Sequence, residues 1–236
     1  MKLYICANGY TEKQKKEAEA CIEELTKAGH DCHLSSAPEC DLIISIGGDG
    51  ALLRAAQTAL RFDKPLFGIN SGRLGYLCAL SIQEISRFED VLALCHVHKR
   101  TILEYEWEGE RKLAVNDVVI GKKNFGQTVD LLFECGDVKM PVRGDGLILA
   151  TPTGSTAYNY SAGGPLLEGD QKDLAVTPIC AHNPEAKPLV IPDDRTLTVV
   201  NRRDNAGIYA DGEYIGDLKE KITVNASKQI LKLLLP

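Results

Sequence analysis

The chain has 236 residues, of which 44% are hydrophobic and 25% are charged, and its net charge is −6. A chain of this length can bury the core of one large domain or of two smaller ones, and the composition is that of a globular protein. The acidic balance and the lack of any basic block disfavour nucleic acid and anionic membranes as partners.

The apolar runs and the spacing of cysteine and histidine indicate the cellular compartment and whether a metal site is present. The apolar run Met1–Cys6 is too short for a signal peptide, and no apolar stretch approaches the ~20 residues of a membrane span, so we expect a cytoplasmic protein. The eight cysteines are scattered without a Cys-x-x-Cys pair, and the paired histidines lack a third ligand at useful spacing. We therefore expect reduced thiols and no metal site built from a side-chain cluster.

The first 96 residues alternate between strand and helix patterns. Apolar runs predict strands at 2–7, 32–34, 42–46 and 65–70. Apolar stripes at helical spacing predict helices at 11–28, directly after Gly50, and at 82–94. This alternation favours a first domain, residues 1–96, with a Rossmann-like open parallel sheet and helices on both faces.

From about residue 97 the pattern becomes one of successive strands. Hairpin signals occur at 108–110, 136–137 and 211–212, and long helical periods disappear. We therefore expect a β-rich, β-sandwich-like second domain over 97–220. Residues 221–236 form a tail that can return to the first domain, and its leucines fit a strand or a helical turn equally well.

The central feature of the first domain is the stretch 41–60. A buried strand stops at the glycines Gly47, Gly48 and Gly50, and a helical pattern follows at once. This order places bare backbone N–H groups and a helix N-terminus at the edge of a sheet, where anions bind. Asp49 stands where phosphate loops usually carry a lysine, and a carboxylate beside phosphates must accept a proton, hold a metal ion or receive hydroxyl hydrogen bonds.

Asp49 therefore indicates that a hydroxyl group is phosphorylated. The alternative is a tight turn in which Asp49 merely caps the helix. Arg54 lies about one helical turn past Gly50 on the same face, where it can reach a phosphate or be solvated.

A second candidate region spans residues 143–164. A buried strand, Leu147–Ala150, leads into a turn rich in hydroxyl groups and glycine and then into a short helix. Neutral donors and acceptors of this kind suit a ribose, an amide or the edge of a base. An exposed linker is the alternative reading.

The third candidate is the pair Asn116-Asp117, which interrupts a continuous apolar run. Because buried polar residues need partners, we expect both side chains to contact a ligand, with Asp117 suited to a vicinal diol. A bulge at the rim of a strand is the alternative.

Taken together, these motifs resemble the NAD kinase family over nearly the whole chain. The resemblance rests on Gly47-Gly-Asp-Gly50, on Gly75-Tyr76 at the end of a second glycine loop (71–77), on Asn116-Asp117 and on the long motif from Gly144 to Gly164. It continues through Thr177-Pro-Ile179 and the Asp211-Gly212 hairpin. The first motif is shared with lipid kinases and phosphofructokinases, whereas the long motif is specific.

The resemblance implies phosphoryl transfer from ATP, with Mg²⁺ or another divalent cation, to the 2′-hydroxyl of the adenosine ribose of NAD. Asp49 would take the proton, while Gly47, Gly48 and Gly50 would approach the donor phosphates. The residues that the resemblance assigns to NAD binding are Asp49, Gly50, Arg54, Tyr76, Asn116, Asp117, Arg143, Asp145, Thr156, Ala157, Tyr158, Asn159 and Ser161.

Arg143 and Asp145 match positions that reach the nicotinamide side of a neighbouring subunit, so the resemblance also implies a homodimer or homotetramer with sites near the subunit interface. The chain departs from the family at three positions. Tyr76 replaces the usual Phe, Asp117 replaces the more common Glu, and Ala51 replaces a Thr near the donor phosphates.

Two other functions stay open at this point. A lipid kinase of the diacylglycerol type shares the glycine-aspartate motif but needs an apolar cleft for its acceptor. A non-catalytic NAD or NADP sensor would bind the dinucleotide without forming NADP.

Overall fold

The computed structural model describes residues 1–6, 12–34, 39–72 and 75–236, and the chain divides into two compact units. The first unit comprises Met1–Lys99 and Ile230–Pro236, and the second comprises Arg100–Gln229. The predicted strand and helix ends at residues 7 and 11, and Arg73 and Leu74 of the predicted loop 71–77, lie outside the described residues. No described helix is long and apolar enough to span a membrane.

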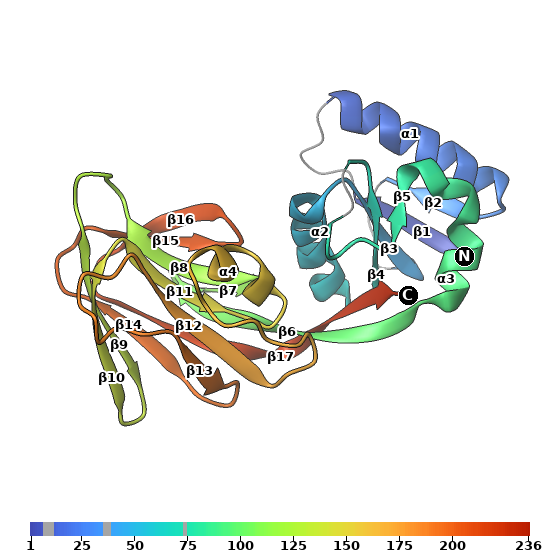
Figure 1. Cartoon of the computed structure of the whole chain (residues 1–236). Helices are drawn as coiled ribbons and strands as arrows, with labels where there is room; N and C mark the ends of the chain where they lie inside the picture. The colour runs from blue at the N-terminus through green and yellow to red at the C-terminus, as the bar shows by residue number, and fades with distance from the viewer. Residues whose placement is uncertain (7–11, 35–38, 73–74) are drawn as a thin grey trace. The chain divides into compact units, whose positions relative to one another are not determined.

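The first unit is built on a parallel sheet (Figure 1), as predicted. Its strands β1 (Lys2–Cys6), β2 (Asp31–His33), β3 (Leu42–Ile46) and β4 (Leu66–Asn70) lie in the order β2-β1-β3-β4, and the short β5 (Leu80–Ser81) also pairs with β4. The end of the last strand, β17 (Lys221–Leu235), lies parallel to β4 with Leu233 opposite Leu66. The tail is therefore a strand rather than a helical turn.

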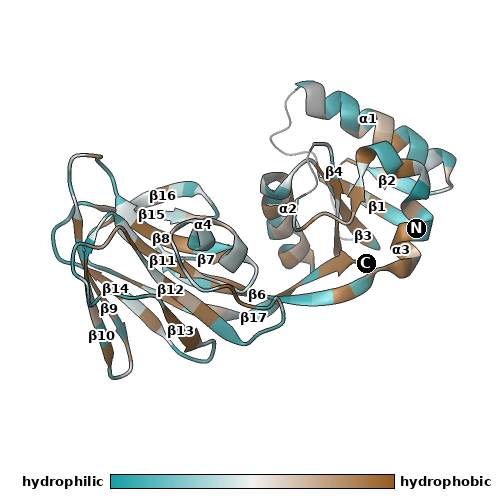
Figure 2. Cartoon of the chain, in the orientation of Figure 1, coloured by the Kyte–Doolittle hydropathy of each residue, from teal (hydrophilic) through white to brown (hydrophobic). Residues whose placement is uncertain are grey.

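Helices cover both faces of this sheet because its central strands β3 and β4 are buried on both sides, which Figure 2 shows as brown along these strands. On one face Phe67 packs edge-on against Phe88 of α3 (Phe88–Leu94), with 5.3 Å between ring centroids, and α1 (Glu12–Lys27) joins the same core. On the other face Gly68 meets α2 (Asp49–Phe62). A Cβ at Gly68 would lie 2.6 Å from Cδ1 of Leu52.

The predicted helix at 82–94 is wrong in its first half. Residues Ile82–Arg87 form a 3₁₀ helix, η1, and only Phe88–Leu94 form an α-helix. The apolar residues Ile82, Ile85 and Phe88 all pack on the core and are spaced by three. That spacing matches the three residues per turn of a 3₁₀ helix better than the 3.6 of an α-helix.

The second unit is a sandwich of two antiparallel sheets, in agreement with the predicted β-sandwich-like fold. One sheet has the order β13-β12-β11-β8-β15-β16, and the other contains β10-β9-β14-β17 together with β6 and β7. Side chains from both sheets form one hydrophobic core. The strands are β6 (His96–Trp107), β7 (Glu110–Ala114), β8 (Asp117–Lys122), β9 (Val129–Cys135), β10 (Val138–Gly144), β11 (Gly146–Ala150), β12 (Asp173–Ile179), β13 (Leu189–Pro192), β14 (Leu197–Asn201), β15 (Ala206–Ala210) and β16 (Glu213–Leu218).

The three predicted hairpins are all present, as β6–β7, β9–β10 and β15–β16. The turn of the last one is tight. Asp211 has φ +48° and Gly212 has φ +84°, the left-handed pair typical of a two-residue type I′ turn. This turn places Asp211 beside the start of β8, because the N–H of Asp211 donates to the carbonyl oxygen of Asp117 at 3.1 Å.

Strands β8, β11 and β12 are buried on both faces. Their inner faces join the sandwich core, and their outer faces pack on Leu167 and Ala162, which belong to the segment 151–172. That segment contains the short helices η2 (Gly154–Thr156) and α4 (Tyr158–Ser161). Burial on both sides accounts for the continuous apolar runs in these strands.

Candidate functional site

The glycine turn of the first unit has the predicted strand–turn–helix geometry. Strand β3 ends at Ile46, Gly47 has φ +141° and α2 begins at Asp49, with Gly48 as its N-cap. Among the described residues, no side chain caps this helix. The reading of Asp49 as a cap is therefore wrong, and the first N–H groups of α2 are available to an anion.

The Asp49 carboxylate is held by the loop that follows β4. Its two oxygens accept the N–H groups of Tyr76 and Leu77, each at 3.3 Å. The loop comes this close because residue 75 is glycine. A Cβ at Gly75 would lie 2.3 Å from Oδ1 of Asp49. The two glycine motifs, 25 residues apart in sequence, therefore form one site.

Two further predicted residues surround this turn. The side chain of Arg54 is exposed, and its Nη1 lies 4.0 Å from the position of a Cβ at Gly50, so the guanidinium lies beside the turn. Tyr76 is 80% exposed and presents an aromatic ring to solvent next to Asp49. The start of α2, the Asp49 carboxylate, the Arg54 guanidinium and the Tyr76 ring therefore lie close together at this turn.

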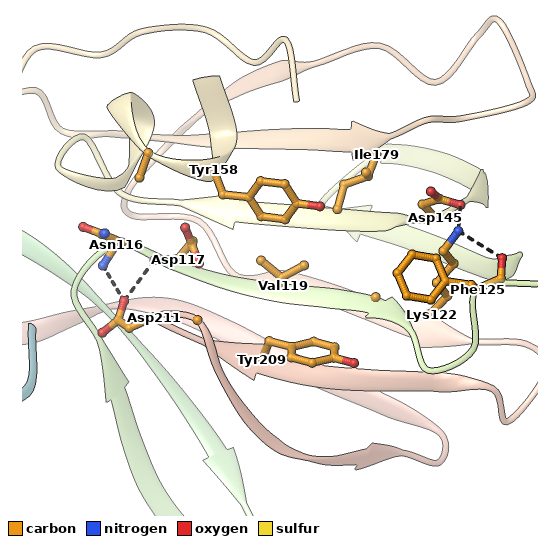
Figure 3. A pocket seen from close by; sticks show the side chains of 13 residues that line it. Asn116, Asp117, Val119, Lys122, Phe125, Asp145, Tyr158, Ile179, Tyr209 and Asp211 are labelled. Carbon is orange, nitrogen blue, oxygen red and sulfur yellow. Dashed lines mark hydrogen bonds and ion pairs between the residues drawn. The ribbon is translucent and has the colours of Figure 1, made fainter. Parts of the chain in front are cut away.

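The second unit contains a cavity of about 590 Å³ on the outer face of the β8–β11–β15 sheet (Figure 3). It is lined by Asn116, Asp117, Val119, Gly121, Lys122, Phe125, Asp145, Ala157, Tyr158, Ile179, Tyr209, Asp211 and Gly212. Five residues predicted to bind NAD are among them: Asn116, Asp117, Asp145, Ala157 and Tyr158. The predicted residues Arg143, Thr156, Asn159 and Ser161 are not.

Asn116 and Asp117 lie at one end of the cavity. Asp117 pairs regularly with Ala150 of β11, so the alternative of a bulge does not hold. Its side chain is only 5% exposed, and burial together with the neighbouring Asp211 carboxylate raises the pKa of Asp117 to about 7. Within the described chain, Oδ1 of Asn116 is buried without a hydrogen-bond partner. A ligand hydroxyl or amide would satisfy it.

The other end of the cavity carries an ion pair. Nζ of Lys122 lies 2.6 Å from Oδ1 of Asp145 and 5.5 Å from the centre of the Phe125 ring, which is 98% exposed. Between the two ends the walls are apolar or aromatic, with Val119, Tyr158 and Tyr209 facing the space (Figure 3). The cavity therefore offers polar groups at both ends and flat apolar surface between them, as an elongated nucleotide requires.

Most of the hydroxyl-rich turn supports the cavity rather than lining it. The Ser155 hydroxyl donates to the Pro152 carbonyl oxygen at 2.7 Å and accepts the N–H of Leu167 at 3.0 Å. Asn159 is fully buried and uses its amide within the protein, donating to the carbonyl oxygens of Ser155 and Pro165 and accepting from the Thr177 hydroxyl. The exposed-linker reading of this turn is therefore wrong.

Several lining residues were missed by the sequence analysis, among them Val119, Lys122, Tyr209 and Asp211. Val119 and Tyr209 are direct cross-strand partners in β8 and β15, which no sequence spacing reveals. Asp211 was predicted as a hairpin residue and as part of the family resemblance, with no contact to the cavity assigned. Because Asp-Gly is a favoured pair for a type I′ turn, the turn alone accounts for this residue in the sequence.

The comparisons with known proteins cover both units. The model of the ATP-NAD kinase N-terminal domain matches residues 5–96, and that of the ATP-NAD kinase C-terminal domain matches residues 99–234. The chain is 36% identical to the NAD kinase of Solibacter usitatus over 84% of this chain and 73% of the relative, and 30% identical to that of Lachnoclostridium phytofermentans over 98% and 85%.

Two solved structures are similar over essentially the full chain. An NAD kinase from Archaeoglobus fulgidus in complex with ATP matches with a TM-score of 0.82 and 27% identity, covering 99% of this chain and 93% of that one. Yeast NADH kinase complexed with NADH matches with a TM-score of 0.81, covering 100% of this chain and 83% of that one. At 20% identity, the second match supports the fold alone.

Proposed function

Because the chain belongs to the ATP-NAD kinase family, we propose that it transfers a phosphoryl group from ATP to the 2′-hydroxyl of the adenosine ribose of NAD, forming NADP and ADP. The observation that carries this proposal is the pair of sites described above. The glycine turn of the first unit presents a carboxylate beside an uncapped helix N-terminus, and the second unit holds an elongated cavity with diol-binding groups. The relatives that match both units are NAD kinases.

NAD occupies the cavity of the second unit in this proposal. The carboxylate of Asp117 accepts hydrogen bonds from ribose hydroxyls. The amide oxygen of Asn116, which is buried without a partner among the described residues, accepts another. The ring of Tyr158, about half exposed, provides a face for a planar base. Asp145 lies at the opposite end, where its partner is Lys122.

ATP binds at the glycine turn. The N–H groups at the start of α2 would donate to the phosphates, and glycine at 47, 48 and 50 would let the backbone come close. Arg54 beside Gly50 adds positive charge. Phosphoryl transfer depends mainly on such positioning and charge neutralisation.

Mg²⁺ fits this site as a companion of the triphosphate. The described residues contain no group of three His, Cys, Asp or Glu side chains that could hold a metal by themselves. Mg²⁺ usually binds through substrate phosphates and one or two carboxylates, and the half-buried Asp49 is the carboxylate at this turn. When bound, the ion neutralises charge on the phosphates.

Asp49 serves as the general base. The 2′-hydroxyl oxygen forms a bond to the γ-phosphorus of ATP, the bond to the β–γ bridging oxygen breaks, and the hydroxyl proton passes to Asp49. The N–H groups of Tyr76 and Leu77 hold the carboxylate in one orientation for this transfer.

We also propose a homo-oligomer in the cytoplasm. Arg143 is exposed and does not line the cavity, and the ring of Phe125 at the cavity mouth is almost fully exposed. An exposed aromatic ring at the mouth of a ligand cavity suits a contact with a second copy of the chain, and sedimentation would give the number of subunits.

The proposal is tested by incubating the protein with NAD, ATP and Mg²⁺ and measuring NADP with an NADP-specific dehydrogenase. NADP formation that requires all three components supports it. Binding of NAD without formation of NADP would establish the sensor alternative, and phosphorylation of diacylglycerol vesicles instead of NAD would establish the lipid kinase.

A further inference from the structure

We infer that Asp211 is a positioning residue that fixes the Asn116–Asp117 segment so that both side chains point into the cavity. This inference rests on the proposed function, because it assigns a role in NAD recognition. Asp211 lies in a hairpin turn almost 100 residues away in sequence, at the rim of the same cavity.

The Asp211 carboxylate accepts three consecutive backbone N–H groups. Oδ2 accepts the N–H of Val115 at 2.8 Å. Oδ1 accepts those of Asn116 and Asp117 at 2.7 and 3.3 Å, and Figure 3 shows Asp211 beside these two residues. A carboxylate has two acceptor oxygens and can take all three groups at once. Since hydrogen bonds to an ionised acceptor are the stronger kind, this single side chain defines the path of the segment.

The carbonyl side of the same segment is held independently by the hydroxyl-rich turn. The Thr151 hydroxyl donates to the carbonyl oxygen of Val115 at 2.7 Å, and the Thr151 N–H donates to that of Asn116 at 2.9 Å. Gly154 packs directly on Asn116, where a Cβ would lie 2.0 Å from the Asn116 carbonyl oxygen. The backbone of residues 115–117 is thus clamped between two loops.

The clamp explains why two polar side chains stay at the edge of a buried sheet. Asp117 is 5% exposed, and among the described residues Oδ1 of Asn116 is buried without a hydrogen-bond partner, so a carboxylate and an amide oxygen lose hydration here. Such a cost is maintained only if the surrounding structure enforces it. Asp211 and Thr151 enforce it here.

The negative charge of Asp211 also affects the pKa of Asp117. Asp117 is faced by Asp211 from the β15–β16 turn and by Tyr158 from α4, and Asp211 is in turn near Glu213 and Tyr105. Because the Asp211 carboxylate contributes to the raised pKa of Asp117, its removal lowers that pKa. The shift reports how close the Asp211 charge lies to Asp117, and the KM for NAD reports whether the hydrogen bonds of Asp211 hold the segment in place.

The test compares Asp211→Asn with Glu213→Gln in steady-state assays with NAD and ATP. Asparagine keeps the shape but has one acceptor oxygen and adds an N–H₂ group facing backbone N–H groups. We expect the KM for NAD to rise at least ~10-fold while the KM for ATP stays within about twofold. Glu213→Gln removes a negative charge from the same hairpin but leaves all three hydrogen bonds, and its KM for NAD should remain near that of the wild type.

The pH dependence separates positioning from stability. In the wild type the KM for NAD should rise as the pH falls through about 7, where Asp117 becomes protonated, and Asp211→Asn should move this rise to lower pH. An unchanged KM for NAD and an unchanged pH profile in Asp211→Asn, with active wild type, would overturn the inference. If the wild type forms no NADP at all, the proposed function fails instead.

A second pair of variants covers the case in which Asp211→Asn does not fold. Thr151→Val removes the hydroxyl that holds the other side of the clamp, and Thr151→Ser retains it. The clamp predicts a raised KM for NAD in Thr151→Val and a value near the wild type in Thr151→Ser. Equal values in the two variants would contradict it.

Discussion

The buried carboxylate of Asp117 contributes a loss of stability at neutral pH relative to acidic pH. Burial and the neighbouring Asp211 charge raise its pKa from the usual 3.8 to about 7. At 1.36 kcal/mol for each pKa unit, this change corresponds to about 4 kcal/mol. Between these two pH values the unfolded chain releases the Asp117 proton and the folded chain keeps it, so the contribution of Asp117 to stability falls as the pH rises from about 4 to 7 and is level above.

Asp117→Asn removes this loss because an amide cannot ionise. We expect the free energy of unfolding of the variant to exceed that of the wild type by up to about 4 kcal/mol at pH 8, and the difference to shrink steadily toward pH 4. The same variant should bind NAD more weakly, since it lacks the carboxylate that accepts a ribose hydroxyl. Asp117 would then be a residue whose function is gained at the expense of stability.

Urea unfolding of both proteins at pH 5, 6, 7 and 8, followed by circular dichroism, measures this difference directly. Asp137→Asn is the matched control, because Asp137 is exposed in the β9–β10 hairpin. Its replacement should leave the pH dependence of the unfolding free energy the same as in the wild type. A difference between Asp117→Asn and the wild type that does not depend on pH would refute the reasoning.

Three further substitutions test the remaining parts of the site. Asp49→Asn should retain NAD binding, measured by calorimetry, but lower kcat by about 10²-fold or more, since the general base is lost; unchanged turnover would remove Asp49 from the mechanism. Gly75→Ala should lower kcat with little change in the KM for NAD, because its Cβ would lie 2.3 Å from the Asp49 carboxylate. Gly126→Ala, where nothing lies within 4 Å of the added Cβ, is the control, and equal kcat values in the two alanine variants would contradict the packing argument. Asn159→Ala should cost about 2–4 kcal/mol of unfolding free energy in urea, because it leaves the buried Thr177 hydroxyl and two carbonyl oxygens without partners; a loss below about 1 kcal/mol would show that Asn159 does not support the loop.

The architecture was largely predictable because its signals are local. Alternating strand and helix periods indicated the parallel sheet of the first unit, and glycine-containing turns indicated the hairpins of the second. The prediction failed at Ile82–Arg87 because apolar residues spaced by three, which match a 3₁₀ helix better, also lie near one face of an α-helix.

The candidate site was predictable where a residue type is unusual for its position. Asp49 in a glycine turn and Asn116-Asp117 in an apolar run are both conspicuous in sequence, and the structure places the latter pair in the cavity. Residues such as Tyr209 and Lys122 are ordinary strand residues whose role depends on which strand lies beside them. Asn159 was predicted to bind NAD, but its amide makes hydrogen bonds to Pro165 and Thr177 within the protein and does not line the cavity.

The measurement that tests the central claim most directly is the position of the phosphate in the product formed from NAD, ATP and Mg²⁺. If Asp49 activates the 2′-hydroxyl, phosphorus NMR of the purified product should show one new phosphomonoester on the 2′-oxygen of the adenosine ribose, formed about 10²-fold or more slowly with Asp49→Asn. A phosphate at another position, or an unchanged rate of product formation with Asp49→Asn, would contradict the account.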